Sequence, residues 1–203
     1  MYEKFINNCK IDNYAETSVS TVKDLPITLS ALYGECGYCS FNKGLYRVYG
    51  EDVAMHWKGI IEEHFSEYKN RIYPFAFDWM GRQFAVDNSD LKVIIVFDPA
   101  TAEVLKAETD LLIFHNSLLL NKDDDLLDEK RFLIVMKSLG LNGLPYNRCI
   151  GFKKSLFLGG IDAFENLEMV SVEVYWEMQL QIYAQIKLLP PGTKIDSIKF
   201  IPK

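Results

Sequence analysis

Histidine and cysteine, from which many catalytic and metal sites are built, are scarce in this sequence: it has three histidines and four cysteines in 203 residues. The cysteines are too few and too irregularly spaced for the disulfide framework of a small secreted domain. They fit a reducing environment best, and the charged start of the chain, Met1 to Phe5, contains no apolar signal-peptide region. We therefore expect a cytoplasmic protein.

Long apolar runs and an excess of positive charge are also missing. The longest apolar runs, such as 93–97 and 118–120, are too short to span a bilayer, so no membrane partner is expected. Lysine and arginine number 22 against 28 aspartates and glutamates, which gives a net charge of −6 and a pI near 5.1. Surfaces that bind nucleic acid are basic, so no nucleic-acid partner is expected either. An acidic protein is instead steered toward basic partners.

The residues that are present have the proportions of a globular protein, with 49% hydrophobic and 25% charged. Apolar residues recur at helical spacing toward both ends of the chain, and strand-like alternation occupies the middle. The predicted helices span 2–9, 24–33, 51–65, 109–120, 124–139 and 171–187. The predicted strands span 44–49, 72–77, 83–86, 93–97, 103–106 and 194–201, with a further strand or extended arm beginning at Cys149.

Short, turn-rich connections such as 87–90 and 98–101 join consecutive strands, which favours antiparallel pairing. We therefore predict an α+β fold with a central antiparallel β-meander flanked by helices, and a smaller C-terminal α/β subdomain. The polar stretch 13–23 carries no clear pattern. The sharpest change of composition lies at 120–125 and suggests two domains, 1–120 and 121–203.

The pattern Cys36-Gly37-Tyr38-Cys39 is the one that could chelate zinc or act as a redox pair. A structural zinc ion needs four ligands, and the sequence has no second such pair at matching spacing. A thioredoxin-like pair starts a helix after a strand, whereas this pair follows a helix end. We favour two half-buried residues in a glycine turn, and a metal-dependent enzyme that uses Cys36 and Cys39 is kept as an alternative.

The histidines do not form a recognisable site. His56 and His64 are eight positions apart on one predicted helix, which is not the i, i+4 spacing of a helical metal pair. His115 is more typical of a hydrogen-bonded helix residue than of a general base. Because the sequence also lacks a Gly-x-Ser-x-Gly elbow and a P-loop, we predict no catalytic residues, no metal and no cofactor.

Four aspartates fall at strand ends or in turns, where their side chains cap the local backbone. A carboxylate metal site is the less specific interpretation. These residues are Asp78, Asp87, Asp90 and Asp98.

Five further carboxylates stand close together at the predicted start of the helix 124–139: Asp123, Asp124, Asp125, Asp128 and Glu129. Such a group commonly complements the helix dipole and keeps the surface soluble. It can also serve as a docking surface for a basic protein. We take these five as candidate partner-binding residues, together with Trp79, the tryptophan whose predicted turn makes it the best candidate for an exposed anchor.

The segment 149–160, with the sequence CIGFKKSLFLGG, ends an apolar run in two glycines, where the backbone usually needs positive φ or close approach. It contains no reactive constellation. Its fold-shaping residues are Gly151, Phe152, Gly159, Gly160, Glu165, Asn166 and Leu167. With the helix that follows, this segment resembles the C-terminal domain of type VI secretion immunity proteins, formerly a domain of unknown function.

The N-terminal part resembles the GAD-like domain of bacterial proteins. The residues that carry this resemblance are Leu25-Pro26 before a Leu/Tyr-rich helix, Gly34 and Gly37, Gly44 to Arg47, and the blocks 74–85 and 97–104.

These resemblances imply a non-enzymatic bacterial immunity protein that binds and neutralises a cognate secreted toxin by occlusion. In the best-known branch that toxin is a DNase, so a basic nuclease is the suspected partner. The alternative is a small-ligand or regulatory binding module, in which the meander and the Gly159–Gly160 turn wall a pocket.

Overall fold

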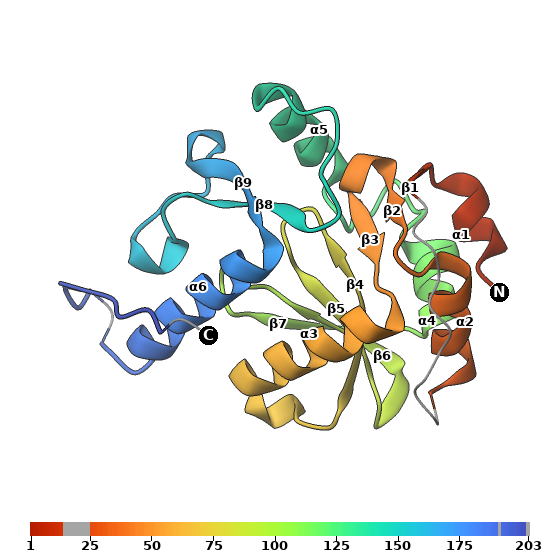
Figure 1. Ribbon diagram of the computed structural model, residues 1–203, viewed down its shortest axis with the longest axis horizontal. Coiled ribbons are helices and arrows are strands. Elements are labelled where there is room, and N and C mark those ends of the chain that lie inside the picture. Colours follow the sequence, from red (N-terminus) through yellow and green to blue (C-terminus); the bar gives the residue numbers. More distant parts are fainter. Residues whose placement is uncertain (14–24, 191, 202–203) are drawn as a thin grey trace.

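The computed structural model describes residues 1–13, 25–190 and 192–201, and it shows an α+β arrangement. Seven strands form one antiparallel sheet in which every strand lies beside its neighbours in the sequence, from β1 to β7. Two more strands, β8 and β9, pair antiparallel in a small second sheet. Figure 1 shows this small sheet and α6 on one side of the molecule and α1 and α2 on the other. The predicted central meander is confirmed.

The strands of the meander are short at its start and longer in its middle. The four strands predicted over 72–106 are all present, and β6 begins three residues earlier than expected, at Asp90. The bounds are β1 Ile11–Asn13, β2 Ser40–Phe41, β3 Tyr46–Val48, β4 Ile72–Asp78, β5 Gln83–Asp87, β6 Asp90–Phe97, β7 Val104–Glu108, β8 Arg148–Phe152 and β9 Leu167–Ser171.

Aspartate side chains hold the ends and turns of the meander, as expected. The carboxylates of Asp78, Asp87, Asp90 and Asp98 each accept a hydrogen bond from the backbone amide two residues further on, over 2.9, 2.9, 3.0 and 2.7 Å. Aspartate suits these turns because its short side chain can accept from the backbone amide two residues further on.

The helices are α1 Glu3–Asn8, α2 Ile27–Cys36, α3 Glu51–His64, α4 Leu111–Ile113, α5 Glu129–Ser138 and α6 Val172–Ile186. The helix predicted over 109–120 is divided: Asp110 caps α4 by accepting from two backbone amides, and a π-helical turn, 114–118, follows it. Of the two glycines expected to stop the helix predicted over 24–33, Gly34 does not, because α2 continues to Cys36, whereas Gly37 does, as its C-cap.

Two predicted elements have other boundaries or another form. The helix predicted from Asp124 begins at Glu129, because Asp125 and Asp128 adopt positive φ angles of 34° and 52° that a right-handed helix does not contain. The predicted strand 194–201 is extended chain, whose backbone at Lys199 and Ile201 bonds to glutamine side chains of α6. Residues 14–23 of the polar stretch, and Asp24 before α2, lie outside the described residues.

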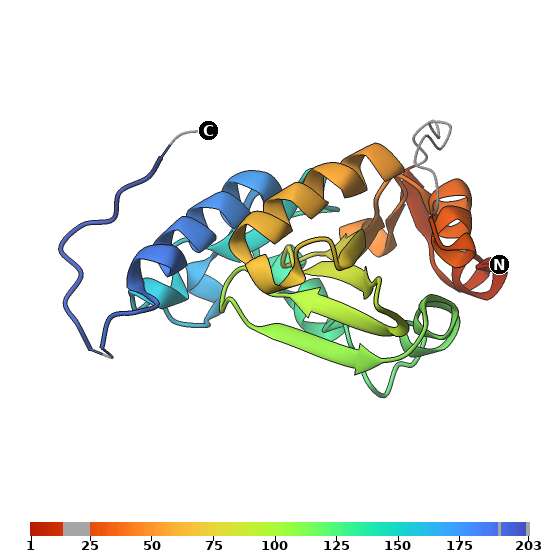
Figure 2. The same cartoon turned by 90° about the horizontal axis from the view of Figure 1, so that it is seen from below.

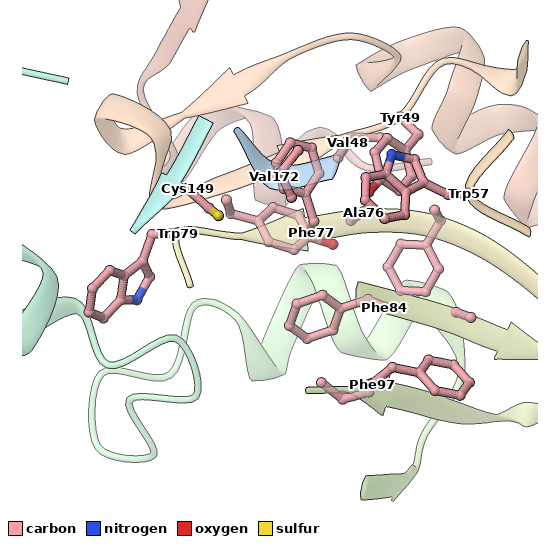
Figure 3. Packing of buried hydrophobic residues seen from close by; sticks show 14 of the residues in the cluster. Val48, Tyr49, Trp57, Ala76, Phe77, Trp79, Phe84, Phe97, Cys149 and Val172 are labelled. Carbon is pink, nitrogen blue, oxygen red and sulfur yellow. The ribbon is translucent and has the colours of Figure 1, made fainter. Parts of the chain in front are cut away.

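The hydrophobic core is continuous from the N-terminal part to the C-terminal part. Figure 2 shows α3 and α6 on the same side of the large sheet, where Trp57 of α3 contacts Trp176 of α6 with ring centroids 5.6 Å apart. Figure 3 shows Trp79, Cys149 and Val172 at one end of the buried cluster that also contains Phe77. The two-domain boundary near residue 120 stays a prediction, since buried side chains from both parts share this core.

Candidate functional site

The five candidate carboxylates lie in the turns before α5 and at its first residue. Asp123, Asp124, Asp128 and Glu129 are exposed, and Asp125 is half-buried. Among the ion pairs of the described residues, none involves any of these five. Within the described residues, no basic side chain therefore lies at ion-pair distance from these carboxylates.

Two of these carboxylates also accept hydrogen bonds from the local backbone, and a third accepts from a side chain. Asp125 accepts from the amide of Glu129 at 2.7 Å, and Asp128 caps α5 by accepting from the amide of Arg131 at 3.3 Å. Asp124 accepts from the side-chain amide of Asn121 at 2.6 Å. Asp128 thus caps α5 at the helix end whose dipole such carboxylates complement, while Asp123 accepts no hydrogen bond from a backbone amide among those of the described residues.

A groove of about 410 Å³ borders this segment. Its apolar surface includes Phe5 of α1 and Phe41 of β2 on one side and Leu126 and Leu127 on the other. Asp125 and Glu129 contribute carboxylates to its edge. The groove thus combines apolar residues with two carboxylates of the acidic segment 123–129 and with Lys122 and Lys130, which flank that segment.

Backbone hydrogen bonds fix the wall that α1 forms. The amide of Phe5 donates to the side-chain oxygen of Asn116 at 3.0 Å, which anchors α1 to the π-helical turn. Beyond α1, the amide of Lys10 donates to the side chain of Asn42 at 2.9 Å, and the amide of Asn42 donates back to the carbonyl of Lys10 at 2.8 Å. Helix α1 and the end of β2 are therefore held together as one wall.

Trp79 supports the wall of the groove that Leu126 and Leu127 form. It is buried, so the prediction that it is an exposed anchor is wrong. Its side chain is 1% exposed and packs against Phe132 of α5. The indole Nε1 donates to the carbonyl of Leu127 at 2.7 Å. A turn normally lies at the surface, but the segment before α5 covers this one, so Trp79 cannot contact a partner in this structure.

The glycine-rich segment shapes the C-terminal part, as its lack of reactive groups suggested. A Cβ atom on Gly151 would lie 2.7 Å from the ring of Tyr175, so only glycine permits this approach of β8 to α6. Gly159 has φ +76°, and a Cβ on Gly160 would lie 2.0 Å from the carbonyl oxygen of Lys154.

Asn166 closes the loop that these glycines shape. Its side-chain oxygen accepts from the amide of Lys154 at 2.8 Å, and its side-chain nitrogen donates to the carbonyls of Lys154 and Ile161, each at 2.9 Å. Leu167 is buried opposite Phe152, and Glu165 is exposed. The segment therefore acts through conformation rather than chemistry.

The cysteine pair lies at the end of α2, with both thiols buried. Burial, and then the neighbouring Cys39, raise the pKa of the Cys36 thiol to about 12, and burial also raises the pKa of Cys39. Both thiols are therefore protonated at neutral pH and poor nucleophiles. Within 1–13, 25–190 and 192–201, no group of three or more His, Cys, Asp or Glu side chains is placed to hold a metal ion.

The three histidines have structural partners. His56 and His64 of α3 face Glu173 and Glu177 of α6, at 3.1 and 4.0 Å. His115 is buried in the π-helical turn, where burial lowers its pKa to about 4. None of the three shares a site with the cysteine pair.

Sequence reasoning missed Arg47, a fully buried arginine on β3. Its guanidinium donates to the carbonyls of Pro145 and Arg148 in the chain leading into β8, and to the carbonyl of Asp78. It lies 4.3 Å from the ring centroid of Phe77. An arginine inside an apolar strand was the available signal, because such a charge is rarely buried without partners.

A second, smaller cavity of about 150 Å³ lies between the meander and the glycine-rich segment. It is lined by Arg82 and Asp98 of the meander and by Leu156 and Asp162, which flank the Gly159–Gly160 turn. Burial raises the pKa of the Asp98 carboxyl. Ligand pockets usually measure at least about 300 Å³, so the pocket expected here for the small-ligand alternative is too small for most metabolites.

Comparisons with known proteins identify the C-terminal part. Residues 118–183, about a third of the chain, match the family model described as "T6SS immunity protein Tdi1, C-terminal". This stretch contains the acidic segment, α5, both strands of the small sheet and most of α6. The resemblance of the C-terminal part is thus confirmed over these residues, whereas the GAD-like resemblance of the N-terminal part stays a prediction.

The fold also occurs in a solved structure. The crystal structure of Atu4351 from Agrobacterium tumefaciens aligns with a TM-score of 0.62 over 89% of each chain, at 14% sequence identity. At that identity the likeness shows the fold alone. No curated protein matches the chain. Of the helices in the described residues, none has the length and apolar character needed to cross a bilayer.

Proposed function

We propose that this chain is a non-enzymatic immunity protein that binds a cognate toxin of a bacterial type VI secretion system and neutralises it by occlusion. The observation that carries the proposal is the match of residues 118–183 to the C-terminal domain of a type VI immunity protein. Because such a toxin endangers the cell that makes or receives it, the cytoplasm is the proposed place of action.

The charge of the chain supports a basic partner. Its net charge is −6, and the exposed carboxylates before α5 lie inside the matched stretch. Enzymes that act on nucleic acid need basic surfaces. We propose that the toxin is a basic nuclease, and that the acidic segment covers part of the surface that binds its substrate.

The proposed contact surface consists of Asp123, Asp124, Asp125, Asp128 and Glu129. Asp123 and Asp124 are the best test positions because both are exposed and neither caps α5. Opposite charges across an interface mainly accelerate association and set the salt dependence of binding. Losing these two charges should therefore lower the association rate more than it raises the dissociation rate.

The experiment is binding of the purified chain to a catalytically inactive form of the effector encoded beside its gene, by calorimetry and by surface plasmon resonance. We expect a stable complex, and a several-fold lower association rate for the Asp123→Asn/Asp124→Asn variant at low salt, with the difference shrinking at high salt. A Glu67→Gln/Asp196→Asn variant, exposed elsewhere, is the matched control. Absence of binding by the unmodified chain would contradict the proposal.

The groove itself favours the second candidate function, a small-ligand binding module. Its volume of about 410 Å³ lies within the usual range for ligand sites, about 300 to 1,000 Å³. A panel of nucleotides, amino acids and fatty acids, screened by the change in melting temperature, tests this candidate. A rise with one compound that the Leu126→Trp change abolishes would support it, because a ligand that binds only the folded state raises its stability.

A further inference from the structure

We propose that the groove beside the acidic segment receives one apolar or aromatic side chain of the toxin, carried next to a lysine or arginine. We call it the anchor groove, defined by Phe5, Cys9, Phe41, Asp125, Leu126 and Glu129. The inference rests on the proposed function, since it names the part of the toxin that this surface recognises.

Part of the anchor groove suits an apolar side chain. Phe5 and Phe41 line it with rings inclined at 54° and centroids 4.7 Å apart, and both side chains are almost fully buried. Leu126 is 38% exposed at the groove, so part of an apolar side chain is left uncovered there. Interfaces draw most of their binding energy from a few side chains that fill such pockets and lose their contact with water.

The charges around the groove select a basic neighbour for that side chain. Between residues 121 and 130 the chain carries five carboxylates and two lysines, Lys122 and Lys130. Asp125, Glu129 and both lysines line the groove and balance one another, so the excess of negative charge beside it comes from Asp123, Asp124 and Asp128. A cation next to the anchor therefore meets a local excess of negative charge, whereas an acidic neighbour would be repelled.

The groove is held in shape before any partner arrives. On one wall, the backbone amide of Phe5 in α1 donates to the side chain of Asn116. On the other wall, the side chain of Trp79 donates to the backbone carbonyl of Leu127. A preformed pocket loses little conformational entropy on binding. Only one of the two walls lies in the matched residues 118–183, so the other wall, α1 and β2, gives this chain its own means of choosing a toxin.

Cys9 offers a direct measure of occupancy. It lines the groove and is half-buried, whereas Cys36, Cys39 and Cys149 are all buried. Burial raises the pKa of Cys9 to about 11, so alkylation by iodoacetamide is best followed near pH 9. With the inactive effector bound, we expect the alkylation rate of Cys9 to fall at least tenfold. The control is Cys9→Ser/Ser66→Cys, whose new thiol on the exposed turn after α3 should react at similar rates with and without the effector.

Filling the groove should weaken the complex. Leu126→Trp places a large side chain at its exposed edge, and we expect the dissociation constant to rise at least tenfold. Leu133→Trp is the matched control, because Leu133 is 53% exposed on α5 and does not line the groove. Asn8→Trp fills the groove from the opposite wall and replaces Leu126→Trp if that variant melts at a lower temperature than the unmodified chain.

The outcomes separate the two proposals. If the unmodified chain binds the effector but Cys9 reacts at its free rate and Leu126→Trp binds normally, the anchor groove is wrong and the immunity function stands. If the unmodified chain does not bind the effector, both proposals fail.

Discussion

The indole Nε1 of Trp176 donates a hydrogen bond of 2.6 Å to the carbonyl oxygen of Gly81, a residue 95 positions earlier in the chain. Trp176 is fully buried on α6, and Gly81 lies in the turn between β4 and β5 with φ +80°. A Cβ atom on Gly81 would be 3.2 Å from the sulfur of Cys149 on β8. Helix α6, the small sheet and the large sheet therefore meet at this turn.

Trp176→Phe should destabilise the fold measurably. Phenylalanine retains an apolar ring but cannot donate, so the carbonyl of Gly81 keeps only the long 3.5 Å bond from Gln83 Nε2. We expect a cost of about 1–3 kcal/mol, to which the smaller ring adds a packing loss. Urea unfolding, followed by circular dichroism, measures the change. Phe164→Leu, on a ring that is 45% exposed, should shift the midpoint far less. Equal midpoints for Trp176→Phe and the unmodified chain would contradict the prediction.

Gly151→Ala should destabilise the fold by about 1–3 kcal/mol, the usual cost of overpacking. The added methyl group would lie 2.7 Å from the ring of Tyr175 and 2.9 Å from a methyl carbon of Val170. Removing the ring with Tyr175→Ala should make the same glycine substitution less costly, which a double-mutant cycle measures.

Gly59→Ala is the matched control for that substitution. Gly59 lies inside α3 with nothing within 4 Å of its would-be Cβ. Alanine is the better helix former, so this change should stabilise the fold by about 0.5–1 kcal/mol. The change in stability on replacing glycine by alanine is thus expected to have opposite signs at the two positions. A loss of stability at Gly59 as well would contradict this prediction.

The features that the sequence predicted correctly depend on near neighbours. Turns that contain aspartate connect segments of alternating pattern, so residues only a few positions apart were enough to predict the meander. The shaping role of Gly159 and Gly160 was predictable for the same reason, since their conformations are set within one loop. The acidic residues were expected to complement the dipole at the start of this helix, but that start was placed too early, because positive φ angles at Asp125 and Asp128 are not apparent from composition.

The features that were missed depend on contacts between distant segments. Trp79 occupies a turn, yet the segment before α5 folds over it. Arg47 is buried because carbonyl groups 98 and 101 residues away accept its hydrogen bonds. The groove joins α1 to the segment before α5. No local pattern marks any of these contacts.

Arg47→Met should cost about 3–5 kcal/mol, because three hydrogen bonds from a buried charged donor are lost, although the carbonyls of Pro145 and Asp78 each keep a backbone amide. Burial lowers the pKa of Arg47 to about 10, so the guanidinium stays charged at neutral pH. Arg47→Lys should recover only part of the loss, since a lysine ammonium cannot reproduce the planar fork. Unfolding in guanidinium chloride measures both variants.

The control for Arg47 is Arg71→Met. Arg71 pairs with Asp87 at 2.8 Å, but its side chain is 44% exposed. Asp87 is buried but keeps two hydrogen bonds from Ser89, so the loss of the half-exposed Arg71 should cost about 1–2 kcal/mol, less than the loss of Arg47. If Arg71→Met proved as costly as Arg47→Met, burial would not be the reason for the importance of Arg47.

His115 should make the folded state less stable as the pH falls from about 6.5 to about 4. Its Nδ1–H donates to the carbonyl of Leu111 at 2.8 Å, and its Nε2 accepts from the hydroxyl of Tyr46 at 3.1 Å, so the buried ring is neutral. Burial lowers the pKa of His115 from 6.5 to about 4. In this pH range the unfolded chain binds a proton that the folded chain does not, so protonation favours unfolding, by up to about 3 kcal/mol.

His115→Gln removes this titration while keeping a side chain that can form hydrogen bonds. The variant should be less stable at pH 7, because its packing is imperfect, but its free energy of unfolding should fall less steeply than that of the unmodified chain between pH 6.5 and 4. Urea unfolding at half-unit pH intervals measures the difference between the two slopes, which cancels the contribution of carboxylates common to both proteins. His56→Gln, at an exposed histidine, is the matched control for the substitution itself. Parallel curves for His115→Gln and the unmodified chain would mean that His115 does not account for the loss of stability in acid.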